Sequence, residues 1–404
     1  MAKRAKLDVI VAGHICFDVI PRILGKGEDF FKAFRPGKLI DIGEAAISTG
    51  GPVSNTGIGL LKLGVKTGLM GKVGTDFFGR AILERLHAIR LDKSMTVVEG
   101  EHTSYTLAIT PPGIDRIFLH NRGTNNTFGL EDVNYAIARS TKVFHFGYPP
   151  LMKRIYEKDG AELTRIFRKA KQVGCTTSLD MALPDPASPA GKIDWDAALR
   201  RTLPFVDLYL PSGEETLFML DRKTFTARRA EAGHKDVLDF LKIEDLQKVA
   251  AKVLRYGAKA VVLKCGHLGM YIRTAKKSAM KGFGACPPAD LDNWADRELW
   301  EPAFHVEHVA SATGSGDSAI AGFLAAYTRG LSIEECLKYG CAVGAFNVMA
   351  FDAVSGIKSW EETTAAIRKG WKKNPVALIA KTPGWRFDAK RQTWIGPADS
   401  VLAR

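Results

Sequence analysis

The sequence lacks the features that mark membrane, secreted or fibrous proteins. No apolar run reaches 18 residues, so we expect no transmembrane helix. The six cysteines are scattered and include no CxxC pair, which argues against structural zinc and favours reduced thiols. The chain has no internal repeat and no low-complexity segment, and its basic start is not followed by the apolar core of a signal peptide. We therefore expect a cytoplasmic protein.

The composition is that of a globular protein with a basic bias. The chain has 404 residues, of which 46% are hydrophobic and 25% charged, enough for one large domain or two smaller ones. Its net charge of +13 suggests attraction to nucleic acid, nucleotides or phosphorylated metabolites. Residues 368–404 hold nine basic and two acidic residues, and a solvated surface is the simpler interpretation of this tail.

Short apolar runs alternate with longer amphipathic stretches. Each apolar run has four to six residues and ends at or near a turn residue, as buried parallel strands do. The expected strands are 7–12, 143–146, 176–179, 206–210 and 260–264. The expected helices between them include 134–140, 160–173 and 243–256. This order predicts an α/β fold with a mostly parallel central sheet between two helix layers.

Three segments interrupt this pattern. Residues 26–48 have mixed polarity, and residues 95–120 alternate as a hairpin around Pro111-Pro112-Gly113. Strands inserted early in an α/β chain suggest a small β lid over the edge of the sheet. Residues 275–304 form a third irregular stretch, which is either a surface insertion or part of a ligand pocket.

A glycine-rich segment precedes an apolar helix near residue 315. The segment runs Ala312-Thr313-Gly314-Ser315-Gly316-Asp317. Two glycines before a helix let free backbone N–H groups point outward, and the helix dipole makes them an anion hole. Asp317 beside this hole can accept a proton from an attacking hydroxyl. Taken alone, the segment fits an ordinary glycine-rich helix entry equally well.

A second segment, Gly50-Gly51-Pro52-Val53-Ser54-Asn55, also precedes a helix. The paired glycines let a ligand approach the backbone closely, and the Asn55 amide can bind a sugar hydroxyl. Taken alone, an ordinary loop with Asn55 as a cap is the simpler interpretation.

Together, the two segments resemble the two signatures of the PfkB (ribokinase-like) carbohydrate kinase family. The first continues through Leu63-Gly64 and 71–79, and the second is Thr313-Gly314-Ser315-Gly316-Asp317 with its helix through 322–324. They lie about 260 residues apart in the family's order. Weaker matches are 116–125 and 264–269. The resemblance spans roughly residues 7–360 and implies a three-layer α/β/α sandwich with a small β-strand lid.

The resemblance also implies roles for individual residues. The kinases it points to transfer the γ-phosphate of ATP, with Mg²⁺, to an acceptor hydroxyl. By this resemblance Asp317 is the general base, and Gly314, Ser315 and Gly316 form the anion hole. The remaining residues contact the acceptor (Asp18, Gly50, Gly51, Asn55, Asn125), the nucleotide (Lys264, Gly266, Gly269) or, through water, the metal (Glu215). From sequence, Lys264 is equally a phosphate contact or a surface lysine at a strand end.

The sequence departs from the family pattern at three places. Ser311 stands where the family often has an Asp that organises a monovalent-cation site, so activation by potassium is in doubt. The Asn of an Asn-x-x-Glu motif is Ser212 here, while Glu215 is retained. The insertion 275–304 and the tail are longer than a minimal member needs. We expect a kinase domain over 1–365, with lid segments at about 20–48 and 95–120, and a basic C-terminal extension over 366–404.

These observations predict an ATP-dependent carbohydrate kinase and leave its acceptor open. A ketose, a pentose, a keto-deoxy sugar acid and a nucleoside all fit Asp18, Asn55 and Asn125. A catalytically weak sugar or nucleotide sensor is a second hypothesis, motivated by Ser311 and Ser212. A nucleic-acid binder is a third, motivated by tryptophans between basic residues of the tail, and we expect neither nucleic acid nor membrane as a partner. Dimerisation through the lid strands is also expected, because it would cover their exposed edges.

Overall fold

Ten strands form the central sheet of the computed structural model, which describes residues 6–25, 27–111 and 117–400. The strands are β1 (Leu7–Gly13), β4 (Thr67–Met70), β9 (Thr141–Gly147), β10 (Thr176–Leu179), β11 (Leu208–Tyr209), β12 (Ala260–Lys264), β13 (Met270–Thr274), β14 (Glu298–Glu301), β15 (Arg386–Asp388) and β16 (Thr393–Ile395). Their order is β15-β16-β14-β13-β12-β11-β10-β9-β1-β4. Pairing is parallel from β4 to β12 and antiparallel beyond β12. The mostly parallel sheet predicted from the sequence is confirmed.

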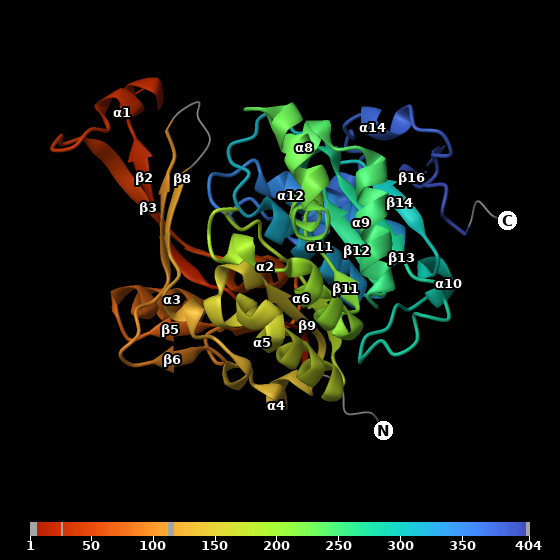
Figure 1. The fold of residues 1–404 in the computed structure, drawn as a ribbon, viewed down its shortest axis with the longest axis horizontal. Coiled ribbons are helices and arrows are strands. Elements are labelled where there is room, and N and C mark those ends of the chain that lie inside the picture. Colours follow the sequence, from red (N-terminus) through yellow and green to blue (C-terminus); the bar gives the residue numbers. More distant parts are fainter. Residues whose placement is uncertain (1–5, 26, 112–116, 401–404) are drawn as a thin grey trace.

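Helices cover both faces of this sheet (Figure 1). They are α1 (Gly27–Ala33), α2 (Pro52–Lys62), α3 (Phe77–Ala88), α4 (Tyr135–Ala138), α5 (Lys153–Gln172), α6 (Trp195–Thr202), α7 (Gly213–Leu220), α8 (Arg222–Ala232), α9 (Ile243–Arg255), α10 (Leu291–Trp294), α11 (Ser315–Thr328), α12 (Ile333–Asn347), α13 (Trp360–Arg368) and α14 (Ala377–Ala380). In β1, Val9 and Val11 join the core that contains α2, α11 and α12, whereas Ile10 and Ala12 join the core of α5, α6, α7 and α9. A strand buried on both faces explains the continuous apolar run over 7–12.

A second sheet stands to one side of the central sheet and forms the lid (Figure 1). Its strands are β2 (Cys16–Ile23), β3 (Ile42–Gly50), β7 (Tyr105–Ile109) and β8 (Ile117–Asn121), in the order β3-β2-β7-β8. The hairpin expected over 95–120 is the antiparallel pair β7 and β8. Most of its turn, including Pro112 and Gly113, lies outside the described residues. The start of that segment was assigned wrongly, because β6 (Thr96–Val98) pairs with β5 (Lys72–Gly74) in a separate sheet.

Several expected elements differ from the structure by a few residues. The helix expected over 160–173 is the second part of α5, because non-helical backbone from Glu157 to Gly160 divides α5 in two. The strand expected over 206–210 shrinks to β11, because Leu203–Phe205 forms a 3₁₀ turn around Pro204. The strands 176–179 and 260–264 have the predicted bounds.

The insertion and the tail both contribute strands to the central sheet. β14 comes from the segment 275–304, and β16 of the tail pairs with it. Behind these strands the buried Arg297 binds Asp399 at 2.9 Å and Glu334 at 2.9 Å. The tryptophans that motivated a nucleic-acid binder pack against protein, as Trp371 does on Phe304 with ring centroids 4.8 Å apart. The boundary at residue 365 stays a prediction.

Within the described residues, every helix is too short or too polar to cross a membrane. All six cysteines are free thiols, as expected.

Candidate active site

Asp317 lies in the first turn of α11, directly after the glycine-rich segment. Gly314 caps the helix with φ +70°, in the left-handed region that favours glycine. A Cβ on Gly314 would lie 2.6 Å from the Cβ of Ala353, so this position requires glycine for space as well. The tight turn leaves the first N–H groups of a 14-residue helix at the mouth of a pocket. Asp317 itself is 1% exposed.

Three side chains donate hydrogen bonds to the Asp317 carboxylate. The Asn55 amide Nδ2 lies 2.9 Å from Oδ2, and the Tyr148 hydroxyl lies 3.1 Å from the same oxygen. The Thr56 hydroxyl lies 3.4 Å from Oδ1. The two signatures of the sequence therefore meet at one carboxylate, because α2 packs against α11.

Burial controls the protonation of this carboxyl group. It raises the pKa of Asp317 above its usual range, while the Asn55 hydrogen bond, the Lys264 charge and the Tyr148 hydroxyl oppose it. A raised pKa makes the carboxylate a better proton acceptor at neutral pH. The arrangement suits a general base that keeps its charge through donated hydrogen bonds.

Lys264, Asp180 and Glu215 line the same pocket beside the N-terminus of α11. The Lys264 ammonium lies 2.6 Å from Asp180 Oδ1 and 2.7 Å from the Leu210 carbonyl oxygen. Its side chain is 12% exposed, so the surface-lysine interpretation is wrong. Burial raises the pKa of Asp180 to about 8 and raises that of Glu215.

Glu215 has a structural role as well as its place in the pocket. Its Oε2 accepts the Ser212 backbone N–H at 2.7 Å, and its own N–H donates to the Ser212 hydroxyl at 3.1 Å. This capping box starts α7 and holds the carboxylate at the pocket wall.

The pocket has a volume of about 520 Å³. Its charged and polar lining includes Tyr148, Asp180, Glu214, Glu215, Asp236, Lys264, His267 and Ser315, and its apolar lining includes Leu238, Phe304, Val306, Val309, Cys341 and Val348. Gly266, Gly269 and Gly316 also line it. A Cβ on Gly269 would lie 2.0 Å from the Glu301 carbonyl oxygen, so glycine is required there. The lining thus offers Lys264 to an anionic group and apolar side chains to an apolar group of a ligand.

Asp18, Gly50 and Gly51 gather on the lid side of Asp317. Asp18 lies on β2, and a Cβ on Gly50 would lie 2.1 Å from its Oδ2. Gly51 has φ +81° and passes so close to His14 that a Cβ would lie 2.5 Å from His14 Nδ1. Burial raises the pKa of Asp18 to about 6. The glycine pair is therefore needed to seat Asp18 and His14 against α2.

Asn125 lies near this group, but its amide is engaged by the backbone. Its Nδ2 donates to the Ile15 carbonyl oxygen at 2.8 Å, and its Oδ1 accepts the Ile15 N–H at 3.2 Å. The side chain is fully buried. Asn125 thus holds the turn between β1 and β2, and its direct contact with an acceptor stays a prediction.

Two residues of the site were missed in the sequence. Tyr148 follows β9 with φ +62°, an uncommon conformation for a side chain of this size, and its hydroxyl reaches Asp317. Asp180 directly follows β10. Their positions after predicted strands could have identified both residues, because polar residues after the carboxyl ends of parallel strands converge at one edge of a sheet.

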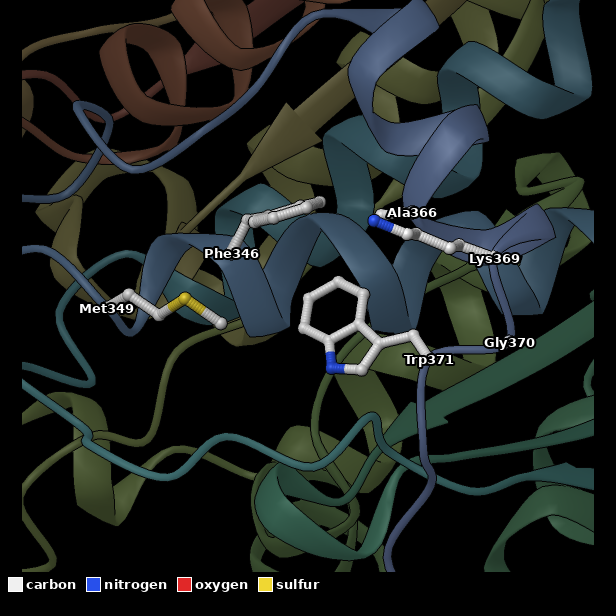
Figure 2. Close-up of a pocket in the computed structure, with 6 residues that line it drawn as sticks. All are labelled: Phe346, Met349, Ala366, Lys369, Gly370 and Trp371. Carbon is white, nitrogen blue, oxygen red and sulfur yellow. The ribbon is translucent and has the colours of Figure 1, made fainter.

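A smaller hollow lies against α12 and is apolar (Figure 2). Its volume is about 340 Å³, and its walls are Phe346, Met349, Ala366, Lys369, Gly370 and Trp371. These wall residues include no carboxylate and no imidazole, unlike the lining of the larger pocket. The pocket at Asp317 is the candidate active site.

Known proteins of one family are similar to this chain. A family model described as pfkB family carbohydrate kinase matches residues 6–360. A 5-dehydro-2-deoxygluconokinase of Lacticaseibacillus casei is 22% identical over 324 residues, which cover 79% of this chain and 86% of that protein.

Solved structures show the same fold. The structure of Arabidopsis thaliana ribokinase complexed with ribose and ATP aligns with a TM-score of 0.65 and 17% identity, over 90% of this chain and 99% of that one. A putative ribokinase II from E. coli in complex with ATP and Mg²⁺ aligns with a TM-score of 0.63 and 19% identity, over 90% and 99%. The predicted three-layer fold with a β lid is confirmed.

Proposed function

The chain belongs to the pfkB family of carbohydrate kinases and is a phosphotransferase with a sugar acceptor, and from this premise we propose that it transfers the γ-phosphate of ATP to a hydroxyl of a sugar acid, with Asp317 as the general base. The observation that carries the proposal is the buried Asp317 carboxylate at the N-terminus of α11. Asp317 removes the proton of the acceptor hydroxyl as that oxygen attacks the γ-phosphorus. The departing ADP takes the electrons of the broken P–O bond.

The backbone N–H groups of Gly314, Ser315 and Gly316 stabilise the charge on the transferred phosphoryl group. The Ser315 N–H donates to the Ala312 carbonyl oxygen at 3.2 Å, so it exchanges that bond for a phosphoryl oxygen, while the helix dipole adds to the attraction of the anion. Lys264 adds a positive charge at this point, since a Cβ on Gly316 would lie 3.4 Å from Lys264 Cε. The apolar lining residues of the pocket then contact the adenine ring.

The carboxylates of this pocket fit Mg²⁺. Asp180 is buried and Glu215 is half-buried, and both carboxylates line the pocket. Mg²⁺ prefers oxygen ligands and keeps several waters. Glu215 would hold the ion through water. A bound Mg²⁺ neutralises phosphate charge during transfer. Ser311 offers no charge for a monovalent cation, so we propose no potassium requirement.

The lid contributes the acceptor side of the site. Asp18 of β2 accepts hydrogen bonds from acceptor hydroxyls, and Asn55 Oδ1, which has no partner among the described residues, accepts another. Closure of the four-stranded lid excludes water and so protects ATP from hydrolysis.

Arg122 favours a sugar acid over a neutral sugar. It directly follows β8, and its positive charge contributes to the lowered pKa of His14 and of His120, so it lies within electrostatic range of the acceptor side. Its Nη1 donates to the Tyr156 hydroxyl at 3.1 Å, which leaves further N–H groups for a carboxylate. The proposed carboxylate contact is therefore charge-assisted.

The test is an ADP-release screen with ATP and Mg²⁺ against sugar acids, ketoses, pentoses and nucleosides, with and without K⁺. We expect a sugar acid as the best acceptor. Arg122→Gln should raise KM for that acid about 10–100-fold, as expected for loss of a charged hydrogen bond worth about 1.5–3 kcal/mol. Arg168→Gln is the control, since Arg168 lies over the Phe205 ring away from the pocket.

Three outcomes contradict parts of the proposal. A neutral ketose or a nucleoside with the highest kcat/KM overturns the choice of a sugar acid. An Arg122→Gln variant with unchanged KM overturns the carboxylate contact. Binding of sugar and ATP in thermal-shift assays without any ADP release supports the sensor hypothesis instead.

We also propose that the lid strands pair two copies of the chain. The lid carries exposed apolar side chains on its two edge strands, including Ile42 and Ile47 on β3 and Phe118 and Leu119 on β8. Covering such edges with a second copy removes apolar surface and unpaired N–H groups from water.

A further inference from the structure

His14, Cys16 and His120 form a compact cluster at the turn between β1 and β2, next to the lid strands. His14 Nε2 and His120 Nε2 lie 3.2 Å apart, and the three potential ligand atoms all lie within 4.8 Å of one another. His14 and Cys16 are 2% and 4% exposed, and His120 is half-buried. Cys16 and His120 also have hydrogen-bond partners outside the cluster, in Asp18 and Thr106.

Strand register explains why the cluster forms. Asp18 of β2 pairs with Thr106 of β7, and Thr106 pairs with His120 of β8. The three side chains therefore stand in one row on one face of the lid. Cys16 precedes Asp18 by two residues on the same strand and shares this face. His14, before β2, closes the group from the side of the central sheet.

The Thr106 hydroxyl connects two members of the cluster. It lies 3.6 Å from Cys16 Sγ as a donor and 3.0 Å from His120 Nδ1. When Thr106 donates to sulfur, His120 Nδ1–H donates to the Thr106 oxygen, and His120 Nε2 keeps its lone pair. A partner that fixes the tautomer of an imidazole and donates to a thiolate is the usual surrounding of a metal ligand.

The His14 ring faces His120 through Nε2, and the two Nε2 atoms lie 3.2 Å apart. Its Nδ1 is buried next to Gly51 with no hydrogen-bond partner among the described residues. Two neutral imidazoles in this arrangement share one N–H between the Nε2 atoms. A cation between them binds both lone pairs instead, and His14 Nδ1 then carries the proton.

The distances fit a tetrahedral ion. With Zn–N bonds of about 2.0–2.1 Å, two imidazole nitrogens lie about 3.3 Å apart, close to the 3.2 Å between His14 Nε2 and His120 Nε2. With a Zn–S bond of about 2.3 Å, nitrogen and sulfur lie about 3.6 Å apart, so a small rotation of the Cys16 side chain completes the set. Imidazole and thiolate ligands select zinc and similar ions over Mg²⁺.

We propose that His14, Cys16 and His120 bind one divalent transition-metal ion, for which Zn²⁺ is best suited, with the fourth position left to water. The site is separate from the proposed Mg²⁺ position at Asp180 and Glu215. Its consequence for catalysis rests on the proposed function: Cys16 Sγ lies 3.2 Å from Asp18 Oδ1, so an ion here binds beside the acceptor and competes with it.

Cobalt titration of the reduced, chelator-treated full chain tests the site without ATP or acceptor, so its result is independent of the kinase proposal. We expect one equivalent of Co²⁺ to produce visible bands of tetrahedral cobalt and a near-ultraviolet sulfur-to-cobalt charge-transfer band, both abolished by Zn²⁺. Cys16→Ser should remove the charge-transfer band. His120→Gln, on the half-buried lid strand, should weaken Co²⁺ binding at least about tenfold.

Cys286→Ser is the matched control, because Cys286 lies outside the cluster near Thr176. It should leave the spectrum unchanged. Absence of the charge-transfer band in the wild type at excess cobalt overturns the proposal, and so does a band that persists in Cys16→Ser or disappears in Cys286→Ser. If circular dichroism shows that Cys16→Ser is unfolded, the affinity of His120→Gln decides alone, and unchanged affinity overturns the proposal.

Discussion

The Asp317→Asn substitution tests whether turnover depends on the carboxylate as a proton acceptor or on the hydrogen bonds around it. The asparagine can keep each hydrogen bond of the aspartate. With its oxygen in the place of Oδ2, it accepts from Asn55 Nδ2 and from the Tyr148 hydroxyl, which lie 2.9 and 3.1 Å from that atom. Its amide nitrogen, in the place of Oδ1, donates to the Thr56 hydroxyl, which can act as acceptor. What disappears is the ability to take up a proton.

The expected loss of turnover follows from that difference. General-base catalysis contributes about 10²–10⁴-fold, so we expect kcat to fall about 10³-fold, equal to about 4 kcal/mol of transition-state stabilisation. The dissociation constant of ATP should stay close to that of the wild type, because Lys264 and the anion hole are unchanged. Steady-state ADP release and ATP titration calorimetry measure the two quantities. Asp29→Asn is the control, since Asp29 is exposed on α1.

Stability should change in the opposite direction. Burial raises the pKa of Asp317, so the folded protein binds more protons than the unfolded chain above the ordinary carboxyl pKa of about 3.9. This group therefore lowers stability as pH rises from that value through its folded pKa. Asp317→Asn removes the penalty, and its Tm should exceed that of the wild type at neutral pH and approach it in acid.

Two results would refute this reasoning. A loss of turnover of less than tenfold means that Asp317 is not the base. A Tm several degrees below that of the wild type at neutral pH means that the carboxylate stabilises the fold, and the kinetic loss then reports on structure.

Three further predictions concern the surroundings of the site. Tyr148→Phe removes a hydrogen bond that lowers the pKa of Asp317, so the acid limb of the kcat profile should move to higher pH, and an unmoved limb contradicts the contact. Arg297→Met removes the guanidinium that binds the buried carboxylates of Glu334 and Asp399 and should cost about 3–5 kcal/mol in urea unfolding. Arg200→Met at an exposed pair should cost less than about 1 kcal/mol, and equal costs would contradict the argument. Leu119→Lys on the lid edge should halve the molar mass measured by light scattering, and a monomeric wild type would exclude the lid dimer.

Local features of the fold could be predicted because their causes are local. The runs at 176–179 and 260–264 are strands with the predicted bounds, since a β-branched run between turn residues favours few alternatives. Gly314 and Gly51 adopt positive φ at the entries to α11 and α2. Their glycine character was visible in the sequence because no other residue is tolerated well in that backbone.

Contacts across the sheet could not be predicted in the same way. Tyr148 and Asp180 follow β9 and β10, yet only the packing of α11 against the strand ends brings the Tyr148 hydroxyl to Asp317. The sequence did not distinguish a phosphate contact by Lys264 from a surface position. The ion pair with Asp180, 84 residues earlier in the chain, excludes the surface position. The tail was expected as a solvated surface, but β16 pairs with β14 in the central sheet.

The sequence by itself determined the fold class, the two glycine-rich turns and the family, because periodicity and backbone freedom act over a few residues. Only the tertiary structure decided which side chains meet. The row of Asp18, Thr106 and His120 depends on the register of three lid strands, and a shift of one residue would turn His120 to the other face. His14 and His120, 106 residues apart, are brought to 3.2 Å by that register and by the turn that Asn125 holds.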